Sequence, residues 1–544
     1  MATLADIPTI VDTPGGIHPF VAQAPNPILP PGPVKLSDAS SPPPTTTRLG
    51  NIRSVAVIGA GISGVATAAH LLLAGLDVTV FERSGNIGGV WVFDARTPLT
   101  PPFPHVAPPA ADSQYVSTPD GLTAEQASVY HASPGPAYEG LTNNIGTAVM
   151  RSTLLDWPEG TGKVITADQV KDYIQELAQK YGVVDRVRLW TRVEGISKPP
   201  GEAQWTVRTR KFIRDGEDAF HLESQTSSFD AVVVASGHYD VPRVPDIPGL
   251  SEWKERYPGR VAHSKAYRSP EAFRDSTVLI IGAGVSSYDI ANQIHEVGGK
   301  SYQVSRDPTR VNTARQEGLA ESCERVPAVT KLVLDPASNP DEQTLLEDTA
   351  PIPGKVVLED GRELIGIHHV VVATGYITTY PFLGDLENPT VAAEAADDKV
   401  VITSDGYTMH NLHKDLFYIP DPTLAFVGVL YNTSTFSLFD FQARVLARIF
   451  KGEATLPSRD EMHRLHRARK AKHKPGEKFH SLSLQDVAYA EEILESVNRD
   501  LEKAGLPTMT AFDEKWHAGF ADLKAFVASV RPDLDLDGER ADGG

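Results

Sequence analysis

The chain has very little cysteine and no long apolar run. Cys323 is its single cysteine, so no intrachain disulfide can form and no redox-active cysteine pair exists. No apolar stretch approaches the ~20 residues that a membrane-spanning helix needs. The N-terminus, MATLADIPTI, lacks the basic segment and the apolar core of a secretion signal. These absences argue against a disulfide scaffold and predict a cytoplasmic protein that is not bound to a membrane.

Positive charge is also scarce. The sequence has 51 Lys and Arg against 70 Asp and Glu, which gives a net charge of -19 at pH 7. This balance argues against nucleic acid and against an anionic membrane surface as partners. The 17 histidines form no HxxxH pair and no Cys/His cluster at ligand spacing, so we predict no metal site.

A complete βαβ pattern begins at Ser54. The apolar run Val55–Ile58 leads into the glycine turn GAGISG, and a helix rich in Ala and Leu precedes a second strand that ends on an acid. Such a turn lets backbone N–H groups approach a diphosphate at the helix N-terminus, and the acid can bind a ribose. Gly88, Gly89 and Trp91 follow the acid. Glycines there would let the backbone pass close to a bound cofactor, and an ordinary turn is the alternative interpretation. The predicted cofactor-binding residues are Gly59, Gly61, Gly64, Glu82, Arg83, Gly89, Val90 and Trp91.

The same pattern returns at Thr277, with the turn GAGVSS. Its third glycine position holds a serine, and its second strand ends on serine and arginine instead of an acid. A carboxylate would repel a 2′-phosphate, whereas a guanidinium and a hydroxyl would bind one. The first unit therefore suits FAD and the second suits NADPH, unless the arginine is only a solvated residue at a strand end. The predicted NADPH-binding residues are Gly282, Gly284, Ser286, Ser287, Ser305 and Arg306.

The two units predict an α/β fold with two Rossmann-like dinucleotide-binding domains, the smaller NADPH domain inserted in the larger FAD domain. A 544-residue chain is long enough for several domains. Proline-rich stretches predict a flexible arm and an irregular insert over 94–135. We expect the arm over 1–48, the FAD domain over 49–240 and 373–455, the NADPH domain over 241–372 and a C-terminal helical extension over 456–544.

Small residues end two further strands, in ASG from Ala235 and in ATGY from Ala373. They suit chain crossings between two nucleotide domains, and equally any tight connection. We include Thr374 and Gly375 among the cofactor-binding residues.

A chain that holds FAD and NADPH can move a hydride from nicotinamide to flavin, and the reduced flavin then needs an acceptor. The lack of a cysteine pair excludes a disulfide, and the lack of metal ligands excludes a metal or haem. Oxygen or a small diffusible acceptor remains. A monooxygenase, an oxidase and a small-molecule reductase all stay open at this point.

From Ser54 to Lys451 the sequence resembles the flavin-containing monooxygenases, a family of class B flavoprotein monooxygenases. The stretch from Tyr257 to Tyr267 is similar to the family fingerprint F-x-G-x-x-x-H-x-x-x-[Y/F], with His263 at the histidine and Tyr257 in place of Phe. The segment YEGLTNN resembles the family's Y-x-x-L-x-T-N and places Asn144 on the active-site asparagine, although Gly146 replaces a proline. GAGVSSYDIA, QVSR, ATGY and LAFVGVL…FDFQAR, which includes Gln442, also resemble family motifs.

The resemblance implies that NADPH reduces FAD, that O2 forms a flavin C4a-hydroperoxide, and that an amine nitrogen or a sulfide takes its distal oxygen. Asn144, His263 and Tyr267 would be the catalytic residues, with His263 supporting the domain linker and the nicotinamide pose. Gln442 would bind a cofactor. Baeyer–Villiger enzymes carry Trp at the position of Tyr267, which favours N- or S-oxygenation here.

The expected partners are a small-molecule substrate and O2, with a homodimer allowed, and the family's soluble members suggest a natural-product pathway. A Baeyer–Villiger monooxygenase and an FAD-dependent oxidase remain alternatives. A third alternative is not an enzyme but a nucleotide-binding protein that has lost turnover and has a regulatory or structural function.

Overall fold

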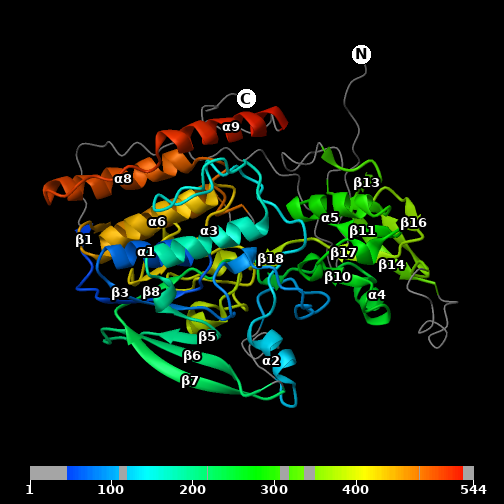
Figure 1. Cartoon of the computed structure of the whole chain (residues 1–544), viewed down its shortest axis with the longest axis horizontal. Coiled ribbons are helices and arrows are strands. Elements are labelled where there is room, and N and C mark those ends of the chain that lie inside the picture. The colour runs from blue at the N-terminus through cyan, green and yellow to red at the C-terminus, as the bar shows by residue number, and fades with distance from the viewer. Residues whose placement is uncertain are drawn as a thin grey trace, which may run out of the picture.

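Two sheet-based bodies lie side by side in the protein (Figure 1). The computed structural model describes residues 46–109, 119–216, 218–306, 318–335, 350–473, 475–476 and 478–530. Each body is built around one of the two predicted βαβ units, which confirms the α/β fold with two Rossmann-like units. The exact domain boundaries given above stay a prediction.

The larger body is built on a seven-stranded sheet in the order β19-β20-β21-β8-β2-β3-β4. Strands β21, β8, β2, β3 and β4 run parallel, and β20 and β19 complete one edge in antiparallel pairing. Its strands are β2 (Ser54–Ile58), β3 (Asp77–Phe81), β4 (Val187–Arg188), β8 (Ala231–Val234), β19 (Leu412–His413), β20 (Phe417–Tyr418) and β21 (Leu424–Phe426). The central strands are runs of buried Val, Ile and Ala, as expected for a parallel sheet covered on both faces.

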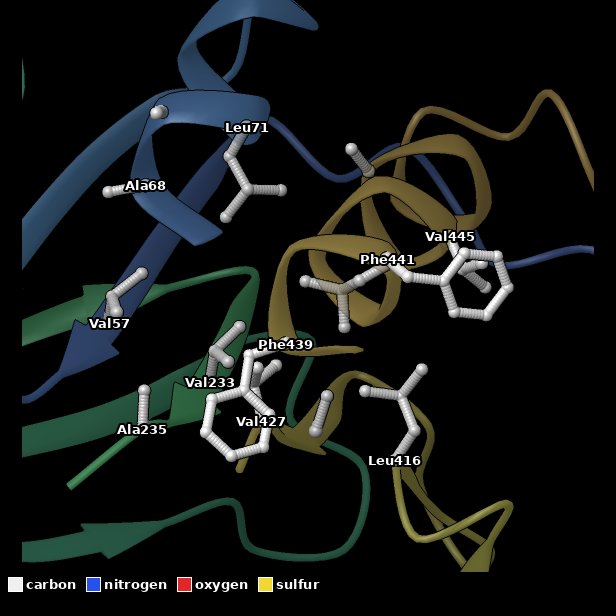
Figure 2. Close-up of a cluster of buried hydrophobic side chains, with 14 of the residues drawn as sticks. Val57, Ala68, Leu71, Val233, Ala235, Leu416, Val427, Phe439, Phe441 and Val445 are labelled. Atoms are coloured by element: carbon white, nitrogen blue, oxygen red, sulfur yellow. The ribbon is translucent and has the colours of Figure 1, made fainter. Parts of the chain in front are cut away.

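Helices α1 (Ile62–Leu73), α3 (Ala167–Lys180) and α6 (Thr435–Phe450) cover one face of this sheet. Figure 2 shows Leu71 of α1 and Phe439 of α6 among the buried side chains that surround Val57 and Val233 of the sheet. The predicted capping box at the start of α3 is confirmed, because Thr166 Oγ1 accepts from the backbone N–H of Gln169. The antiparallel strands β5 (Thr191–Ser197), β6 (Trp205–Arg214) and β7 (Phe220–Phe229) cover the other face.

The smaller body has a five-stranded, wholly parallel sheet in the order β10-β17-β11-β12-β13. Its strands are β10 (Val261–His263), β11 (Thr277–Ile281), β12 (Lys300–Val304), β13 (Cys323–Val326) and β17 (His369–Val372). Helix α5 (Val285–Glu296) follows β11, and α4 (Leu250–Arg256) precedes β10. A three-stranded antiparallel sheet flanks them, with β14 (Val329–Leu334), β15 (Gly354–Leu358) and β16 (Glu363–Ile365).

The chain crosses between the bodies twice, and the two crossings pair with each other. Strand β9 (Val241–Pro242) leaves the larger body and β18 (Tyr376–Ile377) returns to it, in antiparallel pairing. The small residues of ASG and ATGY, which the sequence pattern linked to chain crossings, come shortly before these two strands.

The C-terminal helices are α7 (Arg459–Lys472), α8 (Asp486–Lys503) and α9 (Glu514–Val530), of which α8 and α9 lie along the top of Figure 1. Buried side chains of α7 and α8 belong to the same hydrophobic core as α1 and α6, so these helices extend the larger body instead of forming a separate unit. Strand β22 (Leu456–Pro457) pairs with β1 (Thr46–Thr47), the described end of the predicted N-terminal arm. The rest of that arm lies outside the described residues.

The expectation of an irregular insert over 94–135 is wrong in part, because it contains helix α2 (Ala124–His131). The Thr123 side chain accepts from the backbone N–H of Gln126, and the Gln126 side chain accepts from the backbone N–H of Thr123, which is a capping box. It was not predicted from the sequence, because the surrounding stretch is rich in proline. No helix within the described ranges is long and apolar enough to cross a bilayer.

Candidate active site

One continuous cavity of about 4780 Å³ runs between the two bodies and reaches both glycine turns. Most of the predicted site residues line it. They are Gly59, Gly61, Glu82, Arg83, Gly89, Val90, Trp91, Asn144, Gly282, Gly284, Ser286, Ser305, Arg306, Thr374 and Gly375. Tertiary structure therefore brings together residues from six separate stretches of the sequence.

The first turn presents bare backbone to the cavity. Gly59 has φ +105°, and a Cβ there would lie 2.7 Å from the carbonyl oxygen of Ala235. Gly61 is the N-cap of α1 and supplies no side-chain cap, so the first N–H groups of the helix are open to a ligand. A Cβ on Gly89 would come within 2.9 Å of Gly61 Cα, which explains why a glycine is needed at position 89. This cradle fits the diphosphate of a dinucleotide.

Glu82 closes the first turn from the end of β3. Its Oε2 accepts from the backbone N–H of Ala60 at 2.8 Å, and its Oε1 accepts from the N–H of Ser84 at 2.8 Å. Each carboxylate oxygen has a second acceptor site, so a ribose hydroxyl can still bind. The acid thus holds the turn in shape and faces the cavity at the same time.

A charged cluster lies beside this acid and joins the predicted Arg83 to two residues that sequence reasoning missed. Asp240 Oδ2 accepts from Arg83 at 2.7 Å, and its Oδ1 accepts from Lys265 Nζ at 2.8 Å. Although burial opposes it, these two cations hold the pKa of Asp240 well below its usual range. The cluster joins the end of β3, the first crossing and the end of β10, so it braces the two bodies where they meet. The sequence signals were the predicted Arg83 and the position of Lys265 inside the fingerprint, whereas Asp240 had none.

The second turn repeats this geometry without the acid. Gly282 has φ +120°, and a Cβ there would lie 2.3 Å from the carbonyl oxygen of Ala373. Gly284 is the N-cap of α5, again without a side-chain cap. Ser305 is buried after β12, and Arg306 is exposed on the cavity wall. A guanidinium placed there fits a 2′-phosphate.

Two adjacent asparagines have different surroundings. Asn143 is buried, donates to the carbonyls of Ile145 and Lys163, and accepts from the backbone N–H of Ile165. Asn144 is exposed on the cavity wall. Both asparagines line the cavity, but Asn143 is buried and its amide holds the loop, whereas Asn144 is exposed there.

His263 is buried behind the cavity wall instead of lining it. Its Nδ1 accepts from the backbone N–H of Lys265 at 3.1 Å, which leaves Nε2 to donate to the carbonyl of Gly375 at 3.0 Å. Burial lowers the pKa of His263 to about 3, so the ring is neutral at pH 7. Because Gly375 and Thr374 line the cavity, His263 acts as a positioning residue at the crossing.

Tyr267 and Gln442 lie away from the cavity lining, which argues against direct contact with substrate or cofactor. Tyr267 is 4% exposed and donates to Gln293 Oε1 on α5. Gln442 is fully buried in α6 and donates to the hydroxyl of Tyr489 on α8. Motif similarity alone could not reveal these orientations. Gly64 and Ser287 are also off the lining, because they pack their helices against the sheets.

The fold and the cavity define a class of protein, an α/β enzyme with two dinucleotide sites facing one cavity. Within the described residues, no group of three or more His, Cys, Asp or Glu side chains could hold a metal ion. The pattern of the flavin-binding monooxygenase-like family matches residues 135–316 and 351–516, and that of an NAD(P)-binding Rossmann-like domain matches residues 57–107. The chain belongs to the flavin-containing monooxygenase family, whose cofactors are FAD and NADPH.

Relatives and solved structures agree with this assignment. The flavin-containing monooxygenase ustF2 of Aspergillus flavus is 38% identical over 496 residues, which cover 87% of this chain and 96% of the relative. The flavin-containing monooxygenase iboF of Amanita muscaria is 29% identical, over 75% of this chain and 80% of the relative. The structure of S-allyl-L-cysteine S-oxygenase from Allium sativum shares the fold with a TM-score of 0.62 and 23% identity, over 90% of this chain and 95% of the other. The chain is thus a flavin-dependent monooxygenase.

Proposed function

We propose that the protein uses NADPH and FAD to transfer one oxygen atom of O2 to a nitrogen or sulfur of a small organic molecule. The second oxygen atom leaves as water, and the two electrons come from NADPH. The observation that carries this proposal is that both glycine turns and Asn144 face one cavity. The S-oxygenase from Allium sativum, which shares the fold, is consistent with it.

The chain's own residues would hold the two cofactors, orient them toward each other and shield the cavity from water. The first turn and Glu82 would hold FAD, which supplies the oxygen chemistry when bound, and the second turn with Arg306 would hold NADPH. His263 and the Asp240 cluster fix the crossings between the two sites. Asn144 can donate a hydrogen bond to an oxygen atom or a cofactor edge at the cavity wall. Nothing in this scheme needs a general base acting on the substrate.

The proposal is tested by NADPH consumption with an amine, a sulfide and a ketone, with H2O2 and products measured in parallel. An N-oxide or a sulfoxide is the expected product. An ester or lactone from the ketone would favour the Baeyer–Villiger alternative, and H2O2 alone with every substrate would favour an oxidase.

The role of Asn144 is tested against its neighbour. In Asn144→Ala we expect a larger share of the NADPH electrons to appear as H2O2, with the melting temperature unchanged. Asn143→Ala should instead lower the free energy of unfolding by about 2 kcal/mol, because three buried hydrogen bonds lose their partner. Unchanged coupling in Asn144→Ala would remove this residue from the mechanism.

A further inference from the structure

One end of the cavity has an apolar wall that the two nucleotide turns do not use. It is formed where α9 meets the loop after Asn144. Its lining includes Ile145, Val164, Leu484, Leu523, Phe526 and Val527. Phe526 is 50% exposed and Val164 is 63% exposed. Large apolar side chains that are exposed together on a cavity wall mark a ligand-binding surface.

Helix α9 is fixed against the loop that carries Asn144. A Cβ on Gly519 would lie 2.5 Å from Ala148 Cβ, so the helix and the loop approach as closely as glycine allows. Arg151, buried in that loop, pairs with Asp513 just before the helix begins. Trp516 stacks on Phe520 within the helix at 4.4 Å between ring centroids. The apolar wall is therefore a built part of the fold.

A strained segment joins this wall to the rest of the cavity. Ser483 and Leu484 both have positive φ, at 48° and 64°, a region that side-chain-bearing residues rarely adopt. The backbone N–H of Leu484 donates to the carbonyl of Asn432 at 2.9 Å, and the Leu484 side chain packs with Trp516 of α9. Backbone strain of this kind concentrates at ligand-binding sites and persists only where surrounding contacts hold it.

Two charged groups at this end form an ion pair. Lys163 Nζ lies 3.0 Å from Asp522 Oδ2 across the gap between the loop and α9. Both are lining residues, and both are exposed at the rim. An ionic ligand group would compete with this pair, whereas an uncharged group can contact Ile145, Leu523 and Val527 of the lining.

We propose that this apolar end, the α9 wall, binds the body of the substrate, an uncharged aliphatic or aromatic group that carries the nitrogen or sulfur to be oxygenated. Asn144 directly precedes Ile145 and lines the same cavity, so a body held on the α9 wall places its heteroatom on the Asn144 side. The inference rests on the proposed function and adds the class of substrate to it.

Binding tests the inference without turnover. Methyl phenyl sulfide and dimethyl sulfide are titrated into the oxidised, FAD-loaded enzyme, and the change in flavin absorbance gives each Kd. We expect the phenyl compound to bind at least about tenfold more tightly, because it buries far more apolar surface. In Phe526→Ala this ratio should fall about fivefold, whereas in Ile365→Ala, an equally apolar exposed change on β16, it should not move. Equal Kd values in the wild type, or equal ratios in both variants, would overturn the inference.

A second pair of variants displaces helix α9 as a whole instead of shortening one of its side chains. Gly519→Val should push α9 off Ala148 and reduce the ratio as Phe526→Ala does, while Ala518→Val, on the exposed side of the same helix, should keep it. A ratio unchanged in Gly519→Val, with FAD content and helicity retained, would contradict the inference.

Product analysis distinguishes a failure of the α9 wall from a failure of the proposed function. Sulfoxide formed equally well from both sulfides, with equal Kd values, would leave the proposed function standing and the α9 wall disproved, whereas tight phenyl binding without any sulfoxide would do the reverse.

Discussion

The two glycine turns share their first position and differ at their third. Gly59 and Gly282 both have strongly positive φ, and a side chain on either would strike the carbonyl at the end of a neighbouring strand. At the third position, a Cβ on Gly64 would lie 1.9 Å from the carbonyl oxygen of Gly59. Ser287 occupies the same place in the second turn, where its Oγ donates to the carbonyl of Gly284 at 2.8 Å. The neighbouring strand of the sheet therefore requires glycine at the first position. At the third position, the residue type depends on how closely each helix approaches its own turn.

The units differ again where their second strands end. Glu82 turns inward and accepts two backbone N–H groups, so it is part of the turn as well as the predicted ligand for a ribose. Arg306 is exposed on the cavity wall. The first unit therefore combines a structural role and the predicted ribose recognition in one carboxylate, whereas in the second unit the predicted recognition of a 2′-phosphate falls to an exposed arginine. Four substitutions test this difference.

Gly64→Ser should have the largest effect. The new Cβ would overlap the carbonyl of Gly59, so we expect a loss of about 3 kcal/mol in the free energy of unfolding and little bound FAD. The flavin-to-protein absorbance ratio after gel filtration measures the loss. Gly50→Ser, at a glycine with open space around it, is the control. Normal FAD content in Gly64→Ser would mean that the turn can open.

Arg306→Ala comes next. Removing a charge-assisted bond to a 2′-phosphate costs about 2 kcal/mol, so the Kd for NADPH should rise about 30-fold while that for NADH changes little. Lys300→Ala, at the exposed start of the same strand β12, serves as the control for general charge effects. An equal loss for NADPH and NADH would contradict the assignment of the 2′-phosphate to Arg306.

Glu82→Gln should have a smaller effect, confined to the first site. An amide has one acceptor oxygen and one donor group, so it cannot accept from the N–H groups of both Ala60 and Ser84. We expect the Kd for FAD to rise about tenfold, with NADPH binding unchanged, by titration of the apoprotein. Glu202→Gln, at an exposed position, is the control. If FAD affinity were unaffected, the carboxylate would not be part of the turn.

Ser287→Gly should have the smallest effect. The variant restores the glycine of the first turn and removes the hydroxyl that binds Gly284 and accepts from Gln303, at a cost of about 1 kcal/mol for glycine in a helix. NADPH affinity should change less than about threefold, while the denaturation midpoint falls slightly. A large loss of NADPH affinity would show that Ser287 contributes to binding and not only to packing.

Local patterns predicted the two units well, because strand, turn, helix and strand end follow one another within a short stretch of chain. The capping box at Thr166 was also readable from the sequence. Prediction failed where the environment is made by distant segments. The helix α2 lay hidden in a proline-rich stretch, and Gln442 carries a family motif but is directed at Tyr489 of α8.

The sequence by itself determined that the chain has two dinucleotide units and that one ends in a carboxylate and the other in a guanidinium. These are properties of spacing and charge along short stretches. Only the tertiary structure decided that Asn144 is exposed to the cavity while the buried Asn143 supports the loop. It also decided that α9 forms the apolar end beside that loop. The physical reason is that burial and orientation depend on contacts such as Gly519 with Ala148, between residues far apart in the chain.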